Sequence, residues 1–292
     1  VAALLSGLGT STCDAAVQAY ISERVPYGRR GRVVGFLETA WAGSTLLGVP
    51  LLALLVDQTG WRAAFFSLSA SGLLGLALMI RLIPADRHPG PGVHPRMELQ
   101  QLLTAMLHHR AARGIALCAF LFNAAMDNLF VIYGAWFEDA FQMSVLALGA
   151  GTSVIGAAEL LGEFITVGLG DRLGLKRMAV GGVALCVLTY LLLPAVAHTA
   201  PLALAALFLH FCIFEMTVVT VLSVTTELLP EARATMIAAY YAAAGIGRVA
   251  GALLGGPVWL AWGIRGTGLS SAALTVLSLA ALLWALRSLN RN

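Results

Sequence analysis

Long hydrophobic runs alternate with short polar segments along the whole chain. The runs lie at about 1–22, 33–56, 62–83, 113–137, 145–168, 178–197, 201–226, 234–259 and 268–287. Each is long enough for a helix that crosses the hydrocarbon core of a bilayer, which takes roughly 20 residues. Strands of a membrane barrel would instead alternate in polarity over roughly 10 residues. The pattern therefore predicts an all-α polytopic membrane protein in which all nine runs are transmembrane helices.

The composition agrees with a bilayer location. Hydrophobic residues make up 59% of the chain and charged residues 11%, whereas soluble domains carry roughly 25% charged residues. The four cysteines form no CxxC pair, so neither a metal centre nor a disulfide framework is indicated. We expect contact with lipid, and we expect no cofactor, no metal site and no nucleic-acid partner.

Basic residues gather in loops on one side of the predicted topology. Those loops include Arg29, Arg30, Arg172, Lys176 and Arg177. The opposite side carries Arg62 and Arg265. Because basic loops remain in the cytoplasm, the pattern predicts an external amino end and a cytoplasmic carboxyl end in the cell (inner) membrane.

An internal repeat predicts the domain organisation. "ERVPYGR" at 23–29 resembles "ELLPEAR" at 227–233, an offset of 204 residues, and Gly60-Trp61-Arg62 resembles Gly263-Ile264-Arg265, an offset of 203. Residues 1–83 therefore correspond to about 201–287. Spans four to six would have their counterparts ahead of Val1, so we expect a fragment of a twelve-helix protein with two parallel six-helix halves.

Three segments follow from this repeat. Residues 1–83 are the second part of the N-terminal half, with three helices. Residues 84–112 are a cytoplasmic linker that contains an amphipathic helix, since four prolines and two glycines precede "RMELQQLLTAMLHHR". Residues 113–292 are the C-terminal six-helix half.

The segment "GLGDRLGLKR" at 168–177 concentrates charge between two apolar runs. Its polar and turn-forming positions are Gly170, Asp171, Arg172, Gly174, Lys176 and Arg177. Gly174 permits a positive φ and hence a tight turn. The segment resembles the loop signature of the major facilitator superfamily, and "PYGRRGRVVG" at 26–35 and "DQTGWRAAFF" at 57–66 resemble the segments that flank that superfamily's fifth helix.

This resemblance covers family helices four to twelve, and it implies a function for the loop. Asp171 is expected to dock near the start of the second span, where Arg29, Arg30 and the positive helix end favour an anion. The loop would then act as a conformational latch. The alternative is that its basic residues only set the topology.

Several ionisable or polar residues lie inside predicted spans, where a charge costs about 2.5–3.5 kcal/mol. Asn123 and Asp127 are four residues apart on one helical face, and the resemblance places their helix beside the central pathway. The candidates for the substrate and ion pathway are Asp127, Asn123, Asn128, Asp14, Glu215 and His210. The alternative for Asp127, Asp14 and Glu215 is an interhelical hydrogen bond between the two halves, and the alternative for His210 is a packing role.

Arg248 lies near the middle of the eighth span and needs a partner. Glu159 and Glu163 on the fifth span are the predicted partners, and a buried charge cluster is expected of these three residues. Around Arg248, the glycines Gly247, Gly251 and Gly255 have the small-xxx-small spacing that lets helix backbones approach closely. Pro50 and Pro257 are expected to bend or end their spans.

Together the residues and the resemblance favour a secondary active transporter that moves a small organic solute by alternating access. Efflux of a drug-like or sugar-like compound, coupled to protons or another ion, is the expected direction, and a monomer is the expected state. The alternatives are a metabolite uptake symporter, an intramembrane enzyme or a non-transporting membrane receptor. The enzyme is disfavoured because HExxH, GxSxG and clustered Cys/His ligands do not occur in the sequence.

Overall fold

The computed structural model describes residues 43–83, 109–228 and 233–287, together with the single residues Gly9, Cys13, Val17, Tyr20 and Ala40. The elements are η1 (Ser44–Gly48), α3 (Val49–Thr59), α4 (Trp61–Leu82), α6 (Arg110–Phe130), α7 (Tyr133–Phe141), α8 (Val145–Leu173), α9 (Leu175–Val196), α10 (Ala200–Leu228) and α11 (Arg233–Leu286). All of them are helices. The all-α prediction is confirmed.

The helices match the predicted spans closely. Within the described residues, six helices are long and apolar enough to cross a membrane, and one of these is the 51-residue segment Met236–Leu286. That segment contains a break at Gly263 and therefore accounts for the two predicted spans 234–259 and 268–287. The predicted span 33–56 is described from residue 43 onward, and 1–22 lies outside the described residues apart from the single positions.

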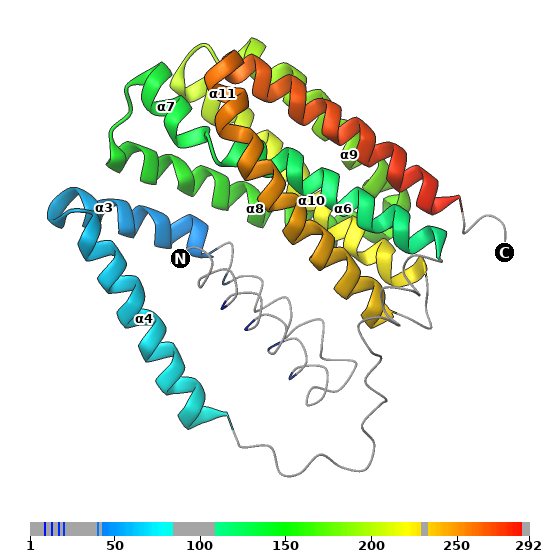
Figure 1. The fold of residues 1–292 in the computed structure, drawn as a ribbon, viewed down its shortest axis with the longest axis horizontal. Coiled ribbons are helices and arrows are strands. Elements are labelled where there is room, and N and C mark those ends of the chain that lie inside the picture. The colour runs from blue at the N-terminus through cyan, green and yellow to red at the C-terminus, as the bar shows by residue number, and fades with distance from the viewer. Residues whose placement is uncertain are drawn as a thin grey trace.

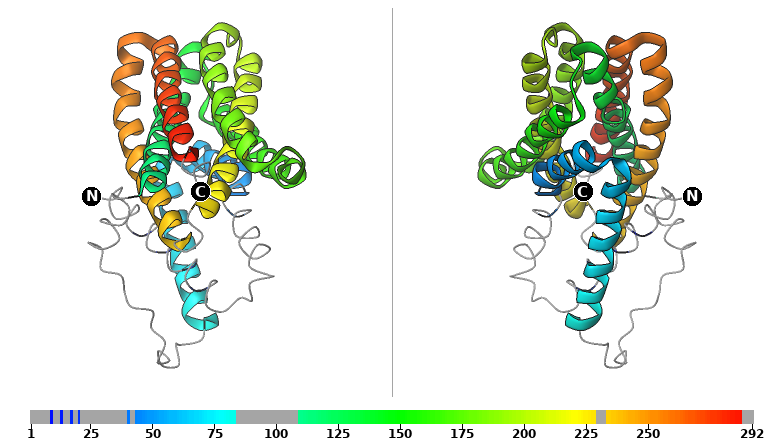
Figure 2. Two further views of the ribbon diagram at one scale, coloured as in Figure 1. Left: turned by 90° about the vertical axis from the view of Figure 1, so that its right-hand side faces the viewer. Right: turned by 90° about the vertical axis from the view of Figure 1, so that its left-hand side faces the viewer.

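Helix α6 lies at the centre of the body formed by residues 110–287. Both legs of α11 pack along it, as Figure 1 and Figure 2 show. Small residues make these contacts close, because a Cβ on Gly114 would lie 2.7 Å from the Ala285 Cβ. Burial on both sides explains why most α6 side chains belong to the hydrophobic core.

The remaining helices of this body surround α10. Helix α10 packs on α8 and on α9, and α9 packs on the second leg of α11. A Cβ at Gly162 of α8 would meet the Cys212 carbonyl oxygen of α10 at 2.5 Å, so these two backbones are in near contact. Ser144 begins α8 as its N-cap, because its side chain accepts a hydrogen bond from the backbone N–H of Ala147.

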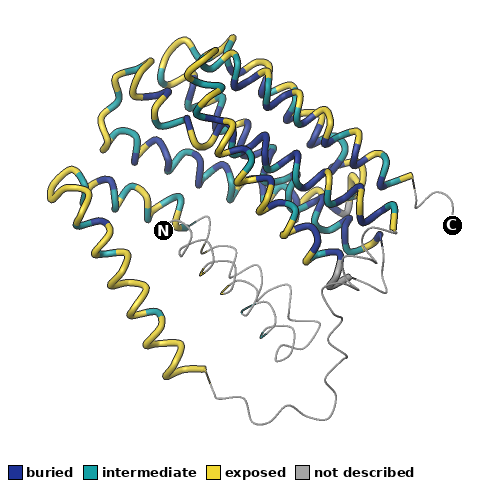
Figure 3. Tube along the Cα trace, in the orientation of Figure 1, coloured by how far each residue is buried: buried dark blue, intermediate teal, exposed yellow. Residues whose placement is uncertain are grey.

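The segment of residues 43–83, called the first-half segment after its predicted place in the repeat, contacts this body through η1 and α3, which pack on α8. Helix α4 extends away from the other described helices, and Figure 3 shows its surface exposed along nearly its whole length. Large apolar side chains cover that surface; Phe66, Ile80 and Leu82 are each more than 70% exposed. A surface of this composition suits lipid or other apolar helices.

The predicted repeat has a counterpart in the backbone. Gly60, between α3 and α4, has φ 85° and ψ 165°, and Gly263, between the two legs of α11, has φ 59° and ψ −157°. Both conformations lie in a region of the φ/ψ map that essentially only glycine occupies. The repeated Gly-Trp-Arg and Gly-Ile-Arg segments thus start a new helix with the same kind of glycine turn.

The two prolines that were expected to bend or end their spans lie inside the helical segments. Pro50 stands in the first turn of α3, directly after the π-helical turn η1, where the missing proline N–H is tolerated. Pro257 lies within α11, and the chain changes direction six residues later, at Gly263. The positive φ of that glycine makes the turn, and proline with its fixed negative φ does not.

Candidate functional site

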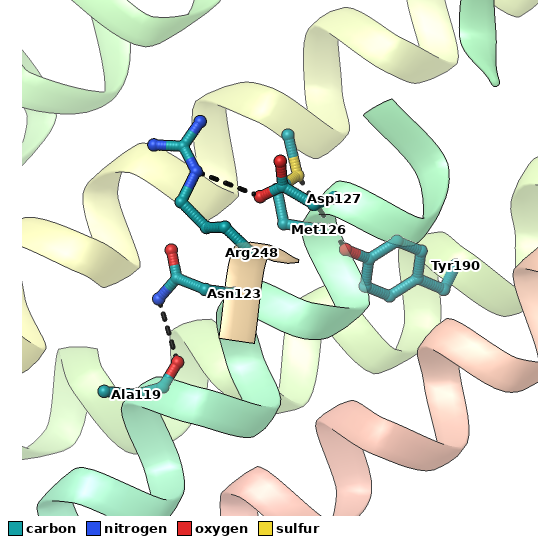
Figure 4. A network of polar contacts seen from close by, with 6 residues as sticks. All are labelled: Ala119, Asn123, Met126, Asp127, Tyr190 and Arg248. Carbon is teal, nitrogen blue, oxygen red and sulfur yellow. Dashed lines mark hydrogen bonds and ion pairs between the residues drawn. The ribbon is translucent and has the colours of Figure 1, made fainter. Parts of the chain in front are cut away.

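Asp127 and Arg248 form an ion pair between α6 and the first leg of α11. The Arg248 Nε atom lies 3.2 Å from the Asp127 Oδ2 atom, and the two side chains are 47% and 16% exposed, respectively. Figure 4 shows Arg248 reaching Asp127 while Asn123 projects from the preceding turn of α6. The predicted partners of Arg248 were Glu159 and Glu163, so this pairing differs from the one expected.

The three glycines around Arg248 make the ion pair possible. A Cβ at Gly247 would collide with the Phe120 carbonyl oxygen, and a Cβ at Gly251 with the Ala124 carbonyl oxygen. Gly255 faces Asn128 and Val131 one turn further along. The predicted close approach at these glycines is therefore confirmed, with α6 as the partner helix. It brings the stem of Arg248 near enough for its guanidinium to reach Asp127.

Asn123 connects this pair to α10. Its Nδ2 atom donates to the Ala119 carbonyl oxygen over 2.9 Å, and its side chain also hydrogen-bonds to Tyr240 of α11. Glu215 of α10 is close enough to Tyr240 to interact with it electrostatically. Asn123 and Asp127 lie one turn apart on α6, and Tyr240 of α11 is the residue that interacts with both Asn123 and Glu215.

His210 occupies the interface between α9 and α10. Its side chain is 1% exposed, and its Nδ1 atom lies 2.7 Å from the Thr189 hydroxyl. The ring stacks obliquely on Tyr190 with 4.2 Å between centroids, and the Tyr190 hydroxyl contacts the Met126 sulfur at 3.9 Å. His210 therefore lies behind α6, one layer removed from Asp127.

Asn128 faces the other way from Asp127. Its Nδ2 atom lies 3.0 Å from the Ser270 hydroxyl and 2.9 Å from the Ser271 hydroxyl, and the residue is fully buried. Ser271 in turn donates to the Ala125 carbonyl oxygen. Asn128 thus joins α6 to the second leg of α11.

Sequence reasoning missed the serines on that second leg. Ser271 and Ser278 donate to the carbonyl oxygens of Ala125 and Cys118, at 2.8 and 2.9 Å. Their spacing of seven residues is a helical signal for one face. That signal identifies the face but not the helix it meets.

Glu159 and Glu163 lie on α8, one helical turn apart. Thr45 of η1 forms a side-chain hydrogen bond with Glu159, and both Glu163 and Arg248 are close enough to Glu159 for electrostatic interaction. The three residues of the predicted charge cluster are therefore neighbours, although Arg248 makes its ion pair with Asp127. Glu159 also contacts the first-half segment.

The predicted loop latch is described in part. Helix α8 ends at Leu173, Gly174 has φ 82°, and α9 begins at Leu175, so the predicted glycine turn is confirmed. The side chains of Arg172, Lys176 and Arg177 are exposed there. The side chain of Asp171, its predicted docking site around Arg29 and Arg30, and the whole of Asp14 lie outside what the structure describes. Among the described residues, no group of three or more His, Cys, Asp or Glu side chains could hold a metal ion.

Comparison with known proteins identifies the relatives of this chain. The family model of the Major Facilitator Superfamily matches residues 1–126 and 115–291. The uncharacterized MFS-type transporter YceJ of Bacillus subtilis (strain 168) is 27% identical over 228 residues, which is 76% of this chain and 56% of the relative. The uncharacterized MFS-type transporter YwfA of the same strain is 25% identical over 276 residues, 94% of this chain and 66% of the relative. The chain thus spans between about half and two thirds of these relatives.

Proposed function

Because this chain belongs to the Major Facilitator Superfamily and is a multi-pass membrane protein, we propose that it works as a secondary active transporter of a small organic solute. The single observation that carries the proposal is the ion pair of Asp127 and Arg248. An ionisable residue inside a membrane span is costly and marks a substrate or ion pathway more often than a structural contact.

The surroundings of the pair support this role. Arg248 is nearly half exposed although it stands midway along its span, so its guanidinium is accessible from one side of α11. Asn123 and Tyr240 add amide and hydroxyl groups one turn away. A solute with a polar or charged group can exchange contacts with these side chains, and the two packings of the transporter would differ in which contacts they allow.

The proposal also includes the direction of solute movement and the ion that drives it. We propose efflux of a drug-like or sugar-like compound, driven by protons or another ion, from a monomer in the cell membrane with a cytoplasmic carboxyl end. Alternating access would come from movement of one six-helix half against the other. The contact of η1 and α3 with α8 is where the described part of the first half meets the second half.

Counterflow in proteoliposomes tests the proposal. Ethidium serves as a drug-like probe and radiolabelled arabinose as a sugar-like probe. The full-length protein is reconstituted in vesicles, and the vesicles are loaded with each probe in turn. Uptake that depends on solute inside the vesicle supports a transporter. Chemical conversion of a probe without translocation would favour an intramembrane enzyme, and binding without translocation would favour a receptor.

A further inference from the structure

The first-half segment contacts α8 through small residues. A Cβ on Gly156 would lie 2.5 Å from the Leu46 backbone nitrogen, and a Cβ on Gly149 would collide with Ala53. Ser153, between these glycines, donates its hydroxyl to the Leu46 carbonyl oxygen over 2.9 Å. The backbones of α8 and the first-half segment are therefore in direct contact rather than separated by long side chains.

The segment that makes this contact is not an ordinary helix. Residues Ser44–Gly48 form the π-helical turn η1, directly before α3. A π-turn is wider than an α-turn and is often found at functional sites. In η1 the carbonyl of Leu46 accepts a hydrogen bond from outside its own helix, which fixes this turn to α8 at Ser153.

Glu159 lies at the end of the same contact. Thr45 of η1 hydrogen-bonds to its carboxyl group. Its second oxygen, Oε2, is enclosed and has no hydrogen-bond partner among the described residues. The carboxyl group is thus held between two parts of the chain, with one oxygen bonded and the other surrounded.

Other charged groups face Glu159 from the packed helices. Glu163 comes from α8 itself and Arg248 from α11. On α10, the Cβ of Glu215 lies against Gly162, where an added Cβ would meet it at 3.0 Å. The described part of η1 presents Thr45 and no titratable side chain, while Asp57 of α3 lies toward the end of the crossing where Ala53 meets Gly149.

The two protonation states of Glu159 suit different arrangements of η1 and α8. Burial of a neutral carboxyl group costs no more free energy than burial of any other uncharged polar group, and the neutral group keeps its hydrogen bond to Thr45. An ionised carboxylate would leave a charged oxygen enclosed without a donor, which is far more costly. Ionisation therefore favours a packing in which η1 moves from α8 and water reaches the carboxylate, and protonation favours the packing described here.

We propose that Glu159 is a proton-binding group whose protonation holds η1 against α8. This inference rests on the proposed function, because it supplies the ion that couples solute movement to the two packings. Arrival of a proton from the aqueous side closes the contact between the described parts of the two halves. Its loss releases the contact.

Distances between spin labels in the full-length protein test the inference. Helices α4 and α9 lie on opposite sides of the pair formed by α3 and α8, as Figure 1 shows. Leu73 of α4 and Leu188 of α9 are both exposed, so labelled cysteines at these positions report whether η1 moves away from α8. In the otherwise unchanged protein we expect the distance distribution to change between acidic and alkaline pH, with the shorter population favoured at the lower pH. E159Q, which mimics the protonated acid, should keep the shorter population over the whole range.

Two further variants complete the test. E138Q removes an exposed carboxyl on α7 and should leave the pH response unchanged. T45V removes the hydroxyl that Glu159 contacts and should reduce the shorter population at low pH, which tests the inference even if E159Q does not fold. An unchanged pH response in E159Q, or a T45V protein identical to the parent, would overturn the inference.

The readout separates this inference from the proposed function. The label distances do not depend on which solute is carried, whereas ethidium and arabinose counterflow measures transport. A pH response that requires Glu159 supports the switch even if neither probe is transported. Counterflow together with a pH response indifferent to E159Q supports transport and refutes the switch.

Discussion

The Nε atom of Arg248 lies 3.2 Å from the Oδ2 atom of Asp127, and the helices that carry them touch backbone to backbone. Gly247 and Gly251, on either side of Arg248, face the carbonyl oxygens of Phe120 and Ala124. The glycine contact and the ion pair are therefore one arrangement. A weaker glycine contact would therefore displace Arg248 from Asp127.

The ion pair predicts a recovery of stability in a double variant. Asp127→Asn or Arg248→Gln alone leaves one charge inside the span without its partner, which should lower the unfolding free energy by about 1–3 kcal/mol. The double variant removes both charges and should be more stable than either single variant. Thermal unfolding in detergent measures this, and a double variant as unstable as the summed singles would refute the coupling.

The glycine contact predicts a sharp difference between two neighbouring positions. An added Cβ at Gly251 would collide with the Ala124 backbone, whereas at Gly256 it would meet nothing within 4 Å. Gly251→Ala should lower the unfolding free energy by about 1–3 kcal/mol through overpacking. Gly256→Ala, the matched control on the same helix, should be neutral or stabilising, since alanine favours a helix. Equal melting temperatures for both variants would contradict the packing.

Asn128 predicts a structural effect. Its amide donates to the hydroxyls of Ser270 and Ser271 and to the Thr267 carbonyl oxygen, so Asn128→Ala removes three interhelical contacts, while Ser270→Ala removes one. We expect the unfolding free energy to fall by about 1 kcal/mol in the asparagine variant and by less in the serine variant. Melting temperatures in detergent provide the comparison. If the serine variant were the less stable of the two, the hydrogen bonds assigned to Asn128 would be contradicted.

The loop after α8 predicts an effect on rate. Asp171→Asn should slow transport of the ethidium or arabinose probe while leaving membrane insertion intact, because the latch would lose its charge attraction to the start of the second span. Asp139→Asn, an exposed acid at the end of α7, is the control and should transport at the parent rate. Parent-like transport by the Asp171 variant would leave the loop with a topological role alone.

The topology itself predicts labelling from one side. Cysteines in place of Arg30 and Lys176 should both react with a membrane-impermeant thiol reagent from the cytoplasmic face, since both belong to basic segments that are predicted to face the cytoplasm. A cysteine in place of Arg265, which follows the glycine turn of α11, should react from the opposite face. Labelling of the first two from different faces would refute the predicted alternation of spans.

The sequence predicted the helices because each depends on a local property. A run of apolar residues of bilayer length can be recognised without knowledge of its neighbours, and Gly174 was recognised as a position that permits a positive φ. Gly60 and Gly263 stood in the repeated motif between predicted spans, but their positive φ values were not predicted.

The partners of polar residues were harder to predict, because pairing depends on how helices are rotated and arranged. Arg248 was assigned to Glu159 or Glu163 by proximity in a supposed half, whereas α6 lies between the two legs of α11 and brings Asp127 nearer. Asn128 adjoins Asp127 in sequence yet faces another helix. The contact of Thr45 with Glu159 depends on a π-turn, which has no periodic signal in the sequence.

The most direct test of the transport site is counterflow with the parent protein and the Asp127→Asn variant reconstituted in parallel. Vesicles preloaded with ethidium or arabinose should accumulate the labelled form of at least one probe when they hold the parent protein, and the variant should lose at least about tenfold of that rate, equivalent to about 1.4 kcal/mol. Arg287→Gln, an exposed substitution after the end of α11, should retain the parent rate. Parent-level counterflow by the Asp127 variant would contradict the proposed site, and uptake of neither probe above protein-free vesicles would contradict the proposed solute classes.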